Sequence, residues 1–176
     1  IVQGKAPSNL ENWDHSANGG DLEDALQGTC GALQDVVHSV TDHGGPGWRL
    51  WPLCDRPPLR SASEMAVGLV ALVGDAAHPM LPYLAQGAGM AIEDAAELQR
   101  ALAMQDLEMP LRLRRYALNR WQRNARVQAH SIRNGRIFHA TGPVRWGRDA
   151  SMRLLGARLL DVPWLYRGDG AGASGF

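Results

Sequence analysis

The stretch that decides the fold reads GDAAHPMLPYLAQGAGMAIEDAAELQRAL and occupies residues 74–102. An unbroken apolar run at 67–73 precedes it, and such a run is typical of a strand that is covered on both faces in a parallel sheet. Pro79 and Pro82 disfavour helix at the residues before them, so we expect an extended loop over 75–86. The order of strand, loop and helix predicts an α/β fold.

Two long helices are expected after this loop. The first covers 87–104, where small and apolar residues recur at helical spacing on one face. That apolar stripe consists of Ala91, Ala95, Leu98 and Leu102. The opposite face carries Glu93, Asp94, Glu97 and Arg100. The second helix begins at about Pro110 and is ended or broken by Asn134 and Gly135.

The faces of the second helix can also be predicted from spacing. Its expected apolar face contains Leu118, Trp121, Ala125 and Ile132. Its expected solvated stripe contains Arg112, Arg115, Arg123 and Arg126. Shorter elements are a two-piece helix over 20–40, a turn at 44–47, an edge strand at 48–53, a third helix over 149–160 and a mobile tail at 168–175.

Composition excludes several classes of protein. The 176 residues, 45% of them hydrophobic, are enough for one domain or for pieces of two. No apolar run approaches the roughly 18 residues of a membrane span, and no secretory signal pattern is present. Two cysteines, Cys30 and Cys54, indicate neither a disulfide framework nor a zinc site. We therefore expect a soluble, cytoplasmic protein. The chain opens on Ile1 rather than Met, as if cut from something longer.

Charge is divided unevenly along the chain. Residues 1–108 carry 15 acidic and 5 basic residues, a net charge of −10, and residues 109–176 carry 13 arginines and 3 aspartates, a net charge of +10. One interpretation is that the Arg-rich helix packs near the acidic part. The other is nucleic-acid binding, but no nucleic-acid motif accompanies the arginines, so we expect no such partner.

The stretch at 74–102 also has the chemistry of a ligand site. Asp75 stands at the carboxyl end of the expected strand, where open α/β sheets bind ligands, and a carboxylate accepts hydrogen bonds from hydroxyl groups. Gly87 and Gly89 open a helix whose unpaired amides favour negative charge. Alternatively, Asp75 caps its own loop and His78 is a packing residue. The glycine spacing is not the dinucleotide fingerprint, and no third ligand supports a metal.

The sequence GDAAHPMLPYLAQGAGMAIEDA resembles the second flavin-contacting motif of group A flavoprotein aromatic hydroxylases, the p-hydroxybenzoate and salicylate hydroxylase-like FAD-dependent monooxygenases. The segments WRLWPLCDRPPL, RNGRIFHATGP and DVPWLYRGD are similar to flanking parts of the same family. The resemblance implies the C-terminal portion of a p-hydroxybenzoate hydroxylase-like FAD-binding fold. This portion would comprise a Rossmann-like FAD domain, a remnant of the substrate-domain sheet and the C-terminal helices.

The resemblance also implies a division of the chain and roles for single residues. Residues 1–59 would be the rest of the substrate domain and its return segment, 60–108 the second half of the FAD domain, and 109–176 a helical region. Asp75 would hold a ribityl hydroxyl of FAD. The amides of Ala88 and Gly89 would face the pyrimidine edge of the flavin. The remaining implied cofactor contacts are Gly74, His78, Pro79 and Gly87.

Substrate contacts follow from the same resemblance. Pro82 would face the substrate cavity through its carbonyl group, and Tyr83 and Gln86 would contact the aromatic substrate, with Pro82 and Gln86 as the catalytic candidates. The implied reaction consumes NADH or NADPH and O2 and hydroxylates a small phenolic or salicylate-like compound. A homodimer is compatible with this, and no membrane partner or metal is expected.

Two motifs of the family are missing from the sequence. They are the Gly-x-Gly-x-x-Gly segment that cradles the FAD pyrophosphate and the middle Asp-Gly motif. We therefore expect the 176-residue chain alone to be inactive and to bind FAD weakly or not at all. The alternative function is a non-catalytic remnant or interaction domain made of the same pieces.

Overall fold

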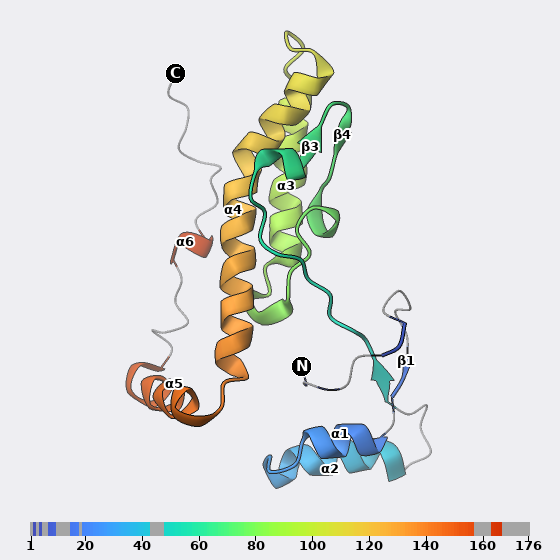
Figure 1. The fold of residues 1–176 in the computed structure, drawn as a ribbon, viewed down its shortest axis with the longest axis vertical. Helices are drawn as coiled ribbons and strands as arrows, with labels where there is room; N and C mark the ends of the chain where they lie inside the picture. Colours follow the sequence, from blue (N-terminus) through green and yellow to red (C-terminus); the bar gives the residue numbers. More distant parts are fainter. Residues whose placement is uncertain are drawn as a thin grey trace. The chain divides into compact units, whose positions relative to one another are not determined.

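A computed structural model describes residues 2, 4, 7–9, 15–17, 19–42, 48–156 and 163–166 (Figure 1). The expected turn at 44–47, the tail at 168–175 and the last part of the expected helix over 149–160 lie outside these residues. The chain divides into two compact units, Ile1–Leu53 and Cys54–Phe176, which are described separately below.

The first unit contains a two-stranded ladder and two short helices. Strand β1 (His15–Ser16) pairs antiparallel with β2 (Arg49–Leu50), so the expected strand at 48–53 is reduced to two residues. Helices α1 (Gly19–Ala25) and α2 (Gly31–Asp42) confirm the expected two-piece helix. The break between them contains Gly28 in the left-handed region, with φ 76°, which an L side chain adopts only with strain.

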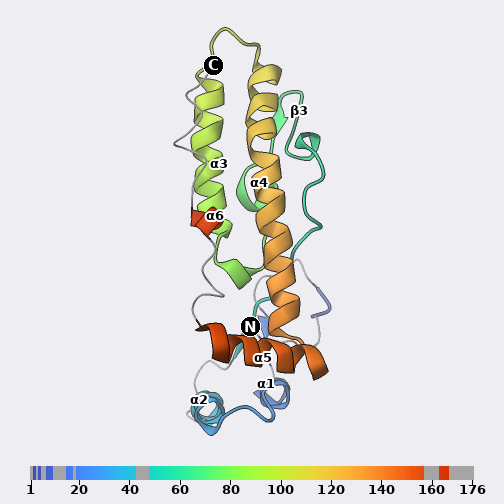
Figure 2. The same ribbon diagram turned by 90° about the vertical axis from the view of Figure 1, so that its left-hand side faces the viewer.

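The second unit is built around two long helices, α3 (Gly87–Leu102) and α4 (Met109–Phe138), which lie side by side along their length (Figure 2). The expected helix over 87–104 is confirmed. The expected break at Asn134 and Gly135 is wrong, because α4 continues through both residues to Phe138. Helix α5 (Gly142–Leu155) begins well before the expected residue 149, and the short α6 (Pro163–Tyr166) completes the described chain.

The expected buried strand at 67–73 is wrong in its details. Strands β3 (Ala66–Val67) and β4 (Val70–Ala71) instead form a tight antiparallel hairpin. Gly68 turns the chain with φ 57°, and Val67, Leu69 and Val70 are 67%, 72% and 65% exposed. An apolar run shows only that the segment can be buried; covering both faces needs neighbouring strands, and none lies beside this hairpin among the described residues.

Three 3₁₀ turns connect these elements; the first and third pack against α4 and the second packs against α3. They are Ala62–Glu64, Gly74–Ala76 and Pro82–Leu84, so the expected loop over 75–86 is a loop with two tight turns. The main core lies between α4, α3 and the segment before the hairpin, and it is made by Leu59, Met65, Ala77, Ala101, Tyr116 and Ala117. A second cluster joins α3, α4 and α6 through Met90, Val127 and Leu165.

Tyr116 ties the hairpin to α4 by a polar contact inside the main core. Its hydroxyl donates a hydrogen bond to the carbonyl oxygen of Leu72 at 2.9 Å. Burial and the nearby Asp94 carboxylate raise the pKa of Tyr116, so the phenol remains a protonated donor. The helix therefore fixes the chain shortly before the loop that begins at Gly74.

We predict that Met65→Ala lowers the free energy of unfolding by about 2–5 kcal/mol, because it leaves a cavity in the main core where Met65 is fully buried. Leu69→Ala removes an exposed side chain of similar size and should change the same quantity by less than ~0.5 kcal/mol. Urea unfolding of the two variants measures both values. Equal effects would show that the core does not lie where the structure puts it.

Candidate functional site

The residues expected to bind a ligand gather where the Gly74 loop meets the start of α3. Asp75 lies in the first 3₁₀ turn after the hairpin, and its side chain is exposed. Its Oδ1 atom is 3.9 Å from the position that a Cβ atom would take on Gly87. The loop thus folds back so that a carboxylate and the N-terminus of α3 face the same place.

Gly74 makes this close approach possible. It has φ 58°, in the left-handed region, and a Cβ atom on it would lie 3.1 Å from the Cβ atom of Ala91. A side chain at Gly74 would therefore be strained by its backbone and would also push the loop off α3.

The N-terminus of α3 has no side-chain cap. Gln86 is its N-cap residue and makes no capping hydrogen bond, and the first turn contains no acidic residue. The first amides of a helix have no partner within the helix and carry partial positive charge, so Gly87, Ala88 and Gly89 offer donors to an electron-rich ligand atom. Ala88 is exposed at this end of the helix.

Beneath the exposed residues lies a buried ionic network centred on Asp94. The Asp94 side chain is fully buried and accepts four hydrogen bonds at its two oxygens. Its Oδ2 atom is 2.5 Å from Nε2 of His78 and 3.2 Å from the amide of Gly74. Its Oδ1 atom receives Nε of Arg120 at 2.8 Å and Nδ2 of Asn124 at 3.0 Å. The Asp94 carboxylate on α3 thus connects Gly74 and His78, at the start of the loop, to Arg120 and Asn124 of α4.

These donors stabilise the ionised form of Asp94. Burial alone would raise the pKa of Asp94, but hydrogen bonds from His78, Asn124 and Arg120 lower it to about 2. Asp94 is therefore ionised at neutral pH and can accept all four hydrogen bonds. His78 is fully buried, and its Nδ1 atom has no hydrogen-bond partner among the described residues. Its contact with flavin stays a prediction.

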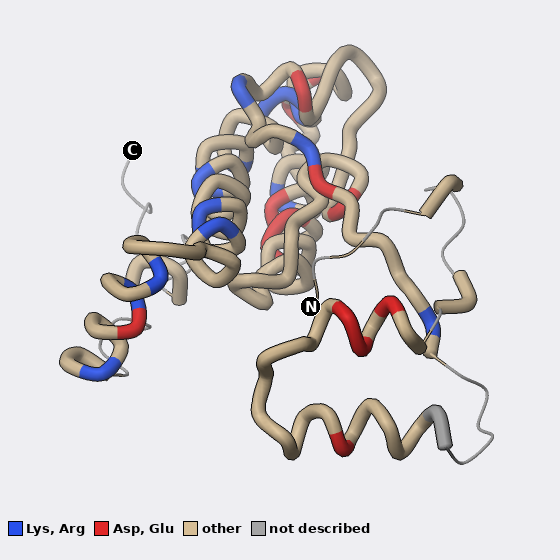
Figure 3. The backbone as a smooth tube through the Cα atoms, turned by 60° about the horizontal axis from the view of Figure 1, so that its bottom comes forward, with Lys and Arg blue, Asp and Glu red and all other residues tan. Residues whose placement is uncertain are grey.

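Glu93 extends the network to the C-terminal part of the chain. It pairs with Arg120 at 2.7 Å and with Arg123 at 2.7 Å, and the guanidinium of Arg123 also donates to the carbonyls of Trp164 and Leu165 in α6. These contacts lower the pKa of Glu93 against the opposing effect of burial. Figure 3 shows the acidic positions of α3 beside the basic positions of α4. The expectation that the Arg-rich helix packs near acidic residues is thereby confirmed.

The expected faces of both helices need correction. On α3, the charged side that includes Asp94 is the buried one, whereas Ala95 of the expected apolar stripe is exposed. On α4, Leu118 is exposed and Arg123 is nearly buried. Arg112 donates to carbonyl groups near the end of α3, so the solvated stripe is also partly wrong. Charged residues can be buried where a partner neutralises them, and spacing along one helix does not reveal that partner.

Polar side chains of α4 hold the rest of the loop by its backbone. Gln128 accepts a hydrogen bond from the amide of Leu59 and donates to the carbonyl of Pro79, and Ser131 donates to the carbonyl of Leu81. Arg56 donates to the carbonyl of Ala77 at 3.2 Å. Sequence reasoning missed all of these residues.

A signal for this polar face was present in the sequence. Four polar residues on α4 recur at helical spacing and lie on its buried side, Arg120, Asn124, Gln128 and Ser131. Such a stripe inside a helix that also carries buried apolar residues indicates satisfied polar contacts with another segment.

The expected substrate contacts lie at the far end of the loop. Pro82 is exposed and Gln86 is half-buried. Tyr83 is half-buried and packs its ring against α4, at Gly135. The structure thus brings Asp75 close to Gln86 and to the first residues of α3. The roles of these residues in ligand binding stay predictions.

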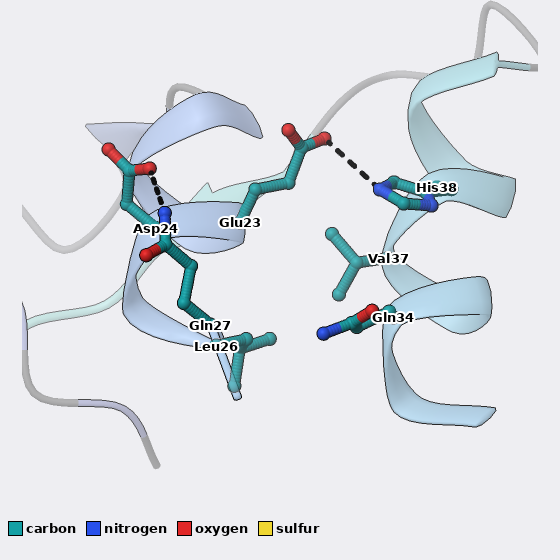
Figure 4. A pocket seen from close by; sticks show the side chains of 7 residues that line it. All are labelled: Glu23, Asp24, Leu26, Gln27, Gln34, Val37 and His38. Atoms are coloured by element: carbon teal, nitrogen blue, oxygen red, sulfur yellow. Dashed lines mark hydrogen bonds and ion pairs between the residues drawn. The ribbon is translucent and has the colours of Figure 1, made fainter. Parts of the chain in front are cut away.

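The first unit has a hollow of its own between α1 and α2, bordered mainly by polar side chains (Figure 4). Glu23 and His38 face each other across it at 4.0 Å, and both are largely exposed. No expected site residue lies there. In the described part of the chain there is no group of three potential metal ligands, and no helix there has the length and apolar character to cross a membrane.

Comparison with known proteins shows which proteins the second unit resembles. A family model described as an FAD binding domain matches residues 58–131, which include the loop, α3 and most of α4. A 3-hydroxybenzoate 6-hydroxylase of Aquipseudomonas alcaligenes is 46% identical over 101 residues, covering 57% of this chain and 25% of that protein. Over these segments the chain is similar to an FAD binding domain and to an aromatic hydroxylase.

Two further matches cover more of the chain. A 3-amino-4-hydroxybenzoate 2-monooxygenase of Streptomyces platensis is 43% identical over 157 residues, which are 89% of this chain and 37% of that protein. The solved structure of a salicylate hydroxylase substrate complex matches with a TM-score of 0.67 and 29% identity, over 89% of this chain and 37% of that one. The fold is thus that of part of an aromatic hydroxylase, and the chain spans well under half the length of these relatives.

We predict that Asp94→Asn lowers the free energy of unfolding by about 3 kcal/mol, because it leaves the buried Arg120 guanidinium without one of its anions. The variant should also change the pH dependence. The pKa of Asp94 is about 2 in the folded chain and near 3.8 when unfolded, so its contribution is complete above about pH 4 and is lost as the pH falls toward 2. About 1 kcal/mol of the difference between the two proteins should disappear between pH 6 and pH 3.

Urea unfolding at several pH values measures this difference. Asp106→Asn removes an exposed carboxylate of the same unit and should stay within ~0.5 kcal/mol of the unchanged protein at neutral pH. Parallel pH curves for Asp94→Asn and the unchanged protein would contradict a buried, ionised Asp94.

Proposed function

We propose that this chain is part of an FAD-dependent, NAD(P)H-consuming monooxygenase that hydroxylates a small aromatic acid, and that residues 74–89 form one wall of its flavin and substrate site. The observation that carries the proposal is the placement of the Asp75 carboxylate beside the uncapped N-terminus of α3. Similarity to an FAD binding domain and to aromatic hydroxylases supports it, and because the chain spans only part of these relatives, the activity of the whole protein is inferred.

The residues at this place fit a bound flavin. A carboxylate that accepts but does not donate hydrogen bonds suits the hydroxyl groups of a ribityl chain, and Asp75 is exposed to receive one. The amides of Ala88 and Gly89 suit an electron-rich ring edge, because a helix N-terminus stabilises negative charge without a cationic side chain. Gly87 and Gly89 leave the backbone accessible. Gly74 and Pro79 shape the turn between these groups.

FAD, when bound, supplies the electron transfer from NADH or NADPH and the reaction with O2. The chain itself contributes orientation and exclusion of water. The loop residues Met80, Leu81 and Leu84 are apolar and half-buried. Helix α4 holds the loop backbone at the carbonyls of Pro79 and Leu81 through Gln128 and Ser131. Because α4 holds the loop from its inner side, the loop can keep its conformation while Pro82 and Gln86 contact a substrate on its outer side.

The proposed substrate class follows from what the relatives are named for. These are 3-hydroxybenzoate, 3-amino-4-hydroxybenzoate and 6-hydroxynicotinate among the curated proteins, and salicylate for the solved structure. All are single aromatic rings that carry a carboxylate and a hydroxyl group. We infer a substrate of this kind, with Pro82, Tyr83 and Gln86 on its border.

The proposal predicts that the monooxygenase containing this chain binds FAD and converts at least one of these four acids to a hydroxylated product with consumption of NADH or NADPH and O2. In Asp75→Ala, FAD affinity should fall about tenfold or more, because a hydrogen bond to a charged group is lost. Flavin absorbance of the purified proteins and mass analysis of the products measure both effects.

Asp106→Ala is the matched control, since it removes an exposed aspartate away from the loop and should keep the flavin content. Normal FAD affinity in Asp75→Ala would show that the role given to Asp75 is wrong. Oxidation of the nicotinamide without any hydroxylated product from the four acids would contradict the proposed reaction.

A further inference from the structure

The ring of Tyr83 lies directly on the backbone of Gly135 in α4. A Cβ atom on Gly135 would be 2.6 Å from Cε2 and 2.8 Å from Cδ2 of the tyrosine ring, closer than real carbon contacts allow. We infer that Gly135 is a positioning residue for substrate specificity. By admitting the Tyr83 ring against α4, it sets how far the Pro82–Gln86 part of the loop projects toward the aromatic substrate. This inference rests on the proposed function.

Two further rings at the same helix end contact the Tyr83 ring. Its centroid lies 5.9 Å from that of Phe138 and 5.6 Å from that of His139, and both rings meet it edge to face. His139 is itself fixed, because its Nδ1 atom donates to the carbonyl oxygen of Gly135 at 2.9 Å. These two rings block a displaced Tyr83 ring from sliding toward the end of α4, so a Cβ atom on Gly135 pushes the ring away from the helix.

The loop backbone beside Tyr83 is also fixed. Ser131 donates to the carbonyl of Leu81 on one side of the turn Pro82–Leu84, and on the other side Ala85 has φ 52°, a conformation uncommon for a residue with a side chain. Since both ends of this short turn are constrained, a shift of the Tyr83 ring is transmitted to Pro82 and Gln86. These are the residues that border the substrate in the proposed function.

Neither helix propensity nor backbone conformation explains a glycine at position 135 of α4. Glycine is less favourable than alanine inside a helix, and at this position the sequence itself predicted a break. The helix nevertheless continues to Phe138, and the φ angle of Gly135 is not in the left-handed region. What the glycine provides is therefore the missing Cβ atom, and Tyr83 occupies that space.

The test compares Gly135→Ala with Gly147→Ala in the FAD-loaded monooxygenase. Gly147 lies inside α5, and a Cβ atom there would meet nothing within 4 Å. The kinetic constants kcat and KM are measured for 3-hydroxybenzoate, salicylate, 6-hydroxynicotinate and 3-amino-4-hydroxybenzoate. We expect Gly135→Ala to change the ratios of kcat/KM among these acids by about tenfold, mainly through KM, with normal FAD content. Gly147→Ala should leave the ratios unchanged.

A second measurement separates packing from specificity. Gly135→Ala should lower Tm in the unchanged background, and this loss should disappear in the Tyr83→Ala background, where the clash is removed. Gly147→Ala should raise Tm slightly or leave it unchanged in both backgrounds.

Each unfavourable outcome has its own meaning. If Gly135→Ala behaves like Gly147→Ala in Tm, the packing on which the inference depends is wrong. If Tm falls but the ratios of kcat/KM stay the same, Gly135 acts on stability alone and its role in specificity is refuted. If the unchanged protein hydroxylates none of the four acids, the proposed function fails, and the specificity role falls with it even when the Tm measurements confirm the packing.

Discussion

The second unit depends on one buried carboxylate. Asp94, which lies in α3, accepts hydrogen bonds from the amide of Gly74, from His78 in the same loop and from two side chains of α4. A single anion therefore fixes the loop, α3 and α4 to one another. Burying such a charge is costly unless its hydrogen bonds are all made, and here they are. The arrangement of loop and helices is therefore specified by electrostatics as well as by apolar packing.

Hydrogen bonds from α4 explain how the exposed loop that we propose as a ligand wall can be rigid. The loop from Gly74 to the start of α3 presents Asp75 and the uncapped amides of α3 on its outer side. On its inner side, Gln128 and Ser131 hold carbonyl groups of the loop, and Met80 and Leu84 pack against the cluster of Met90, Val127 and Leu165. Because backbone groups are held by hydrogen bonds of fixed direction, the outer residues need not contact α4 themselves to be placed accurately.

Several features were predictable from local sequence. The helix that begins at Gly87, a proline-containing loop before it and the pieces of the first helical region all follow from residues close to one another in the chain. The two tight turns within the loop were not predicted. The expectation of a polar ligand near Asp75 also rests on residue types and spacing, whereas its assignment to a flavin rests on the resemblance to the hydroxylase family. The hairpin was not predictable, because a short apolar run has the same appearance whether it is covered on both faces or folded on itself at Gly68.

The sequence by itself determined the resemblance to the hydroxylase motif and the approximate positions of the long helices, because helix propensity, turn geometry and motif spacing act over short distances. It also supplied the residues that we propose for a ligand. Only the tertiary structure decided which side of α3 is buried and why α4 contains Gly135. The first depends on Arg120 and Asn124, which neutralise and bind Asp94 from another helix. The second depends on the ring of Tyr83. A buried charge and a missing Cβ atom can be explained only by the residues that contact them, and in both cases the fold brings those residues from a distant part of the sequence.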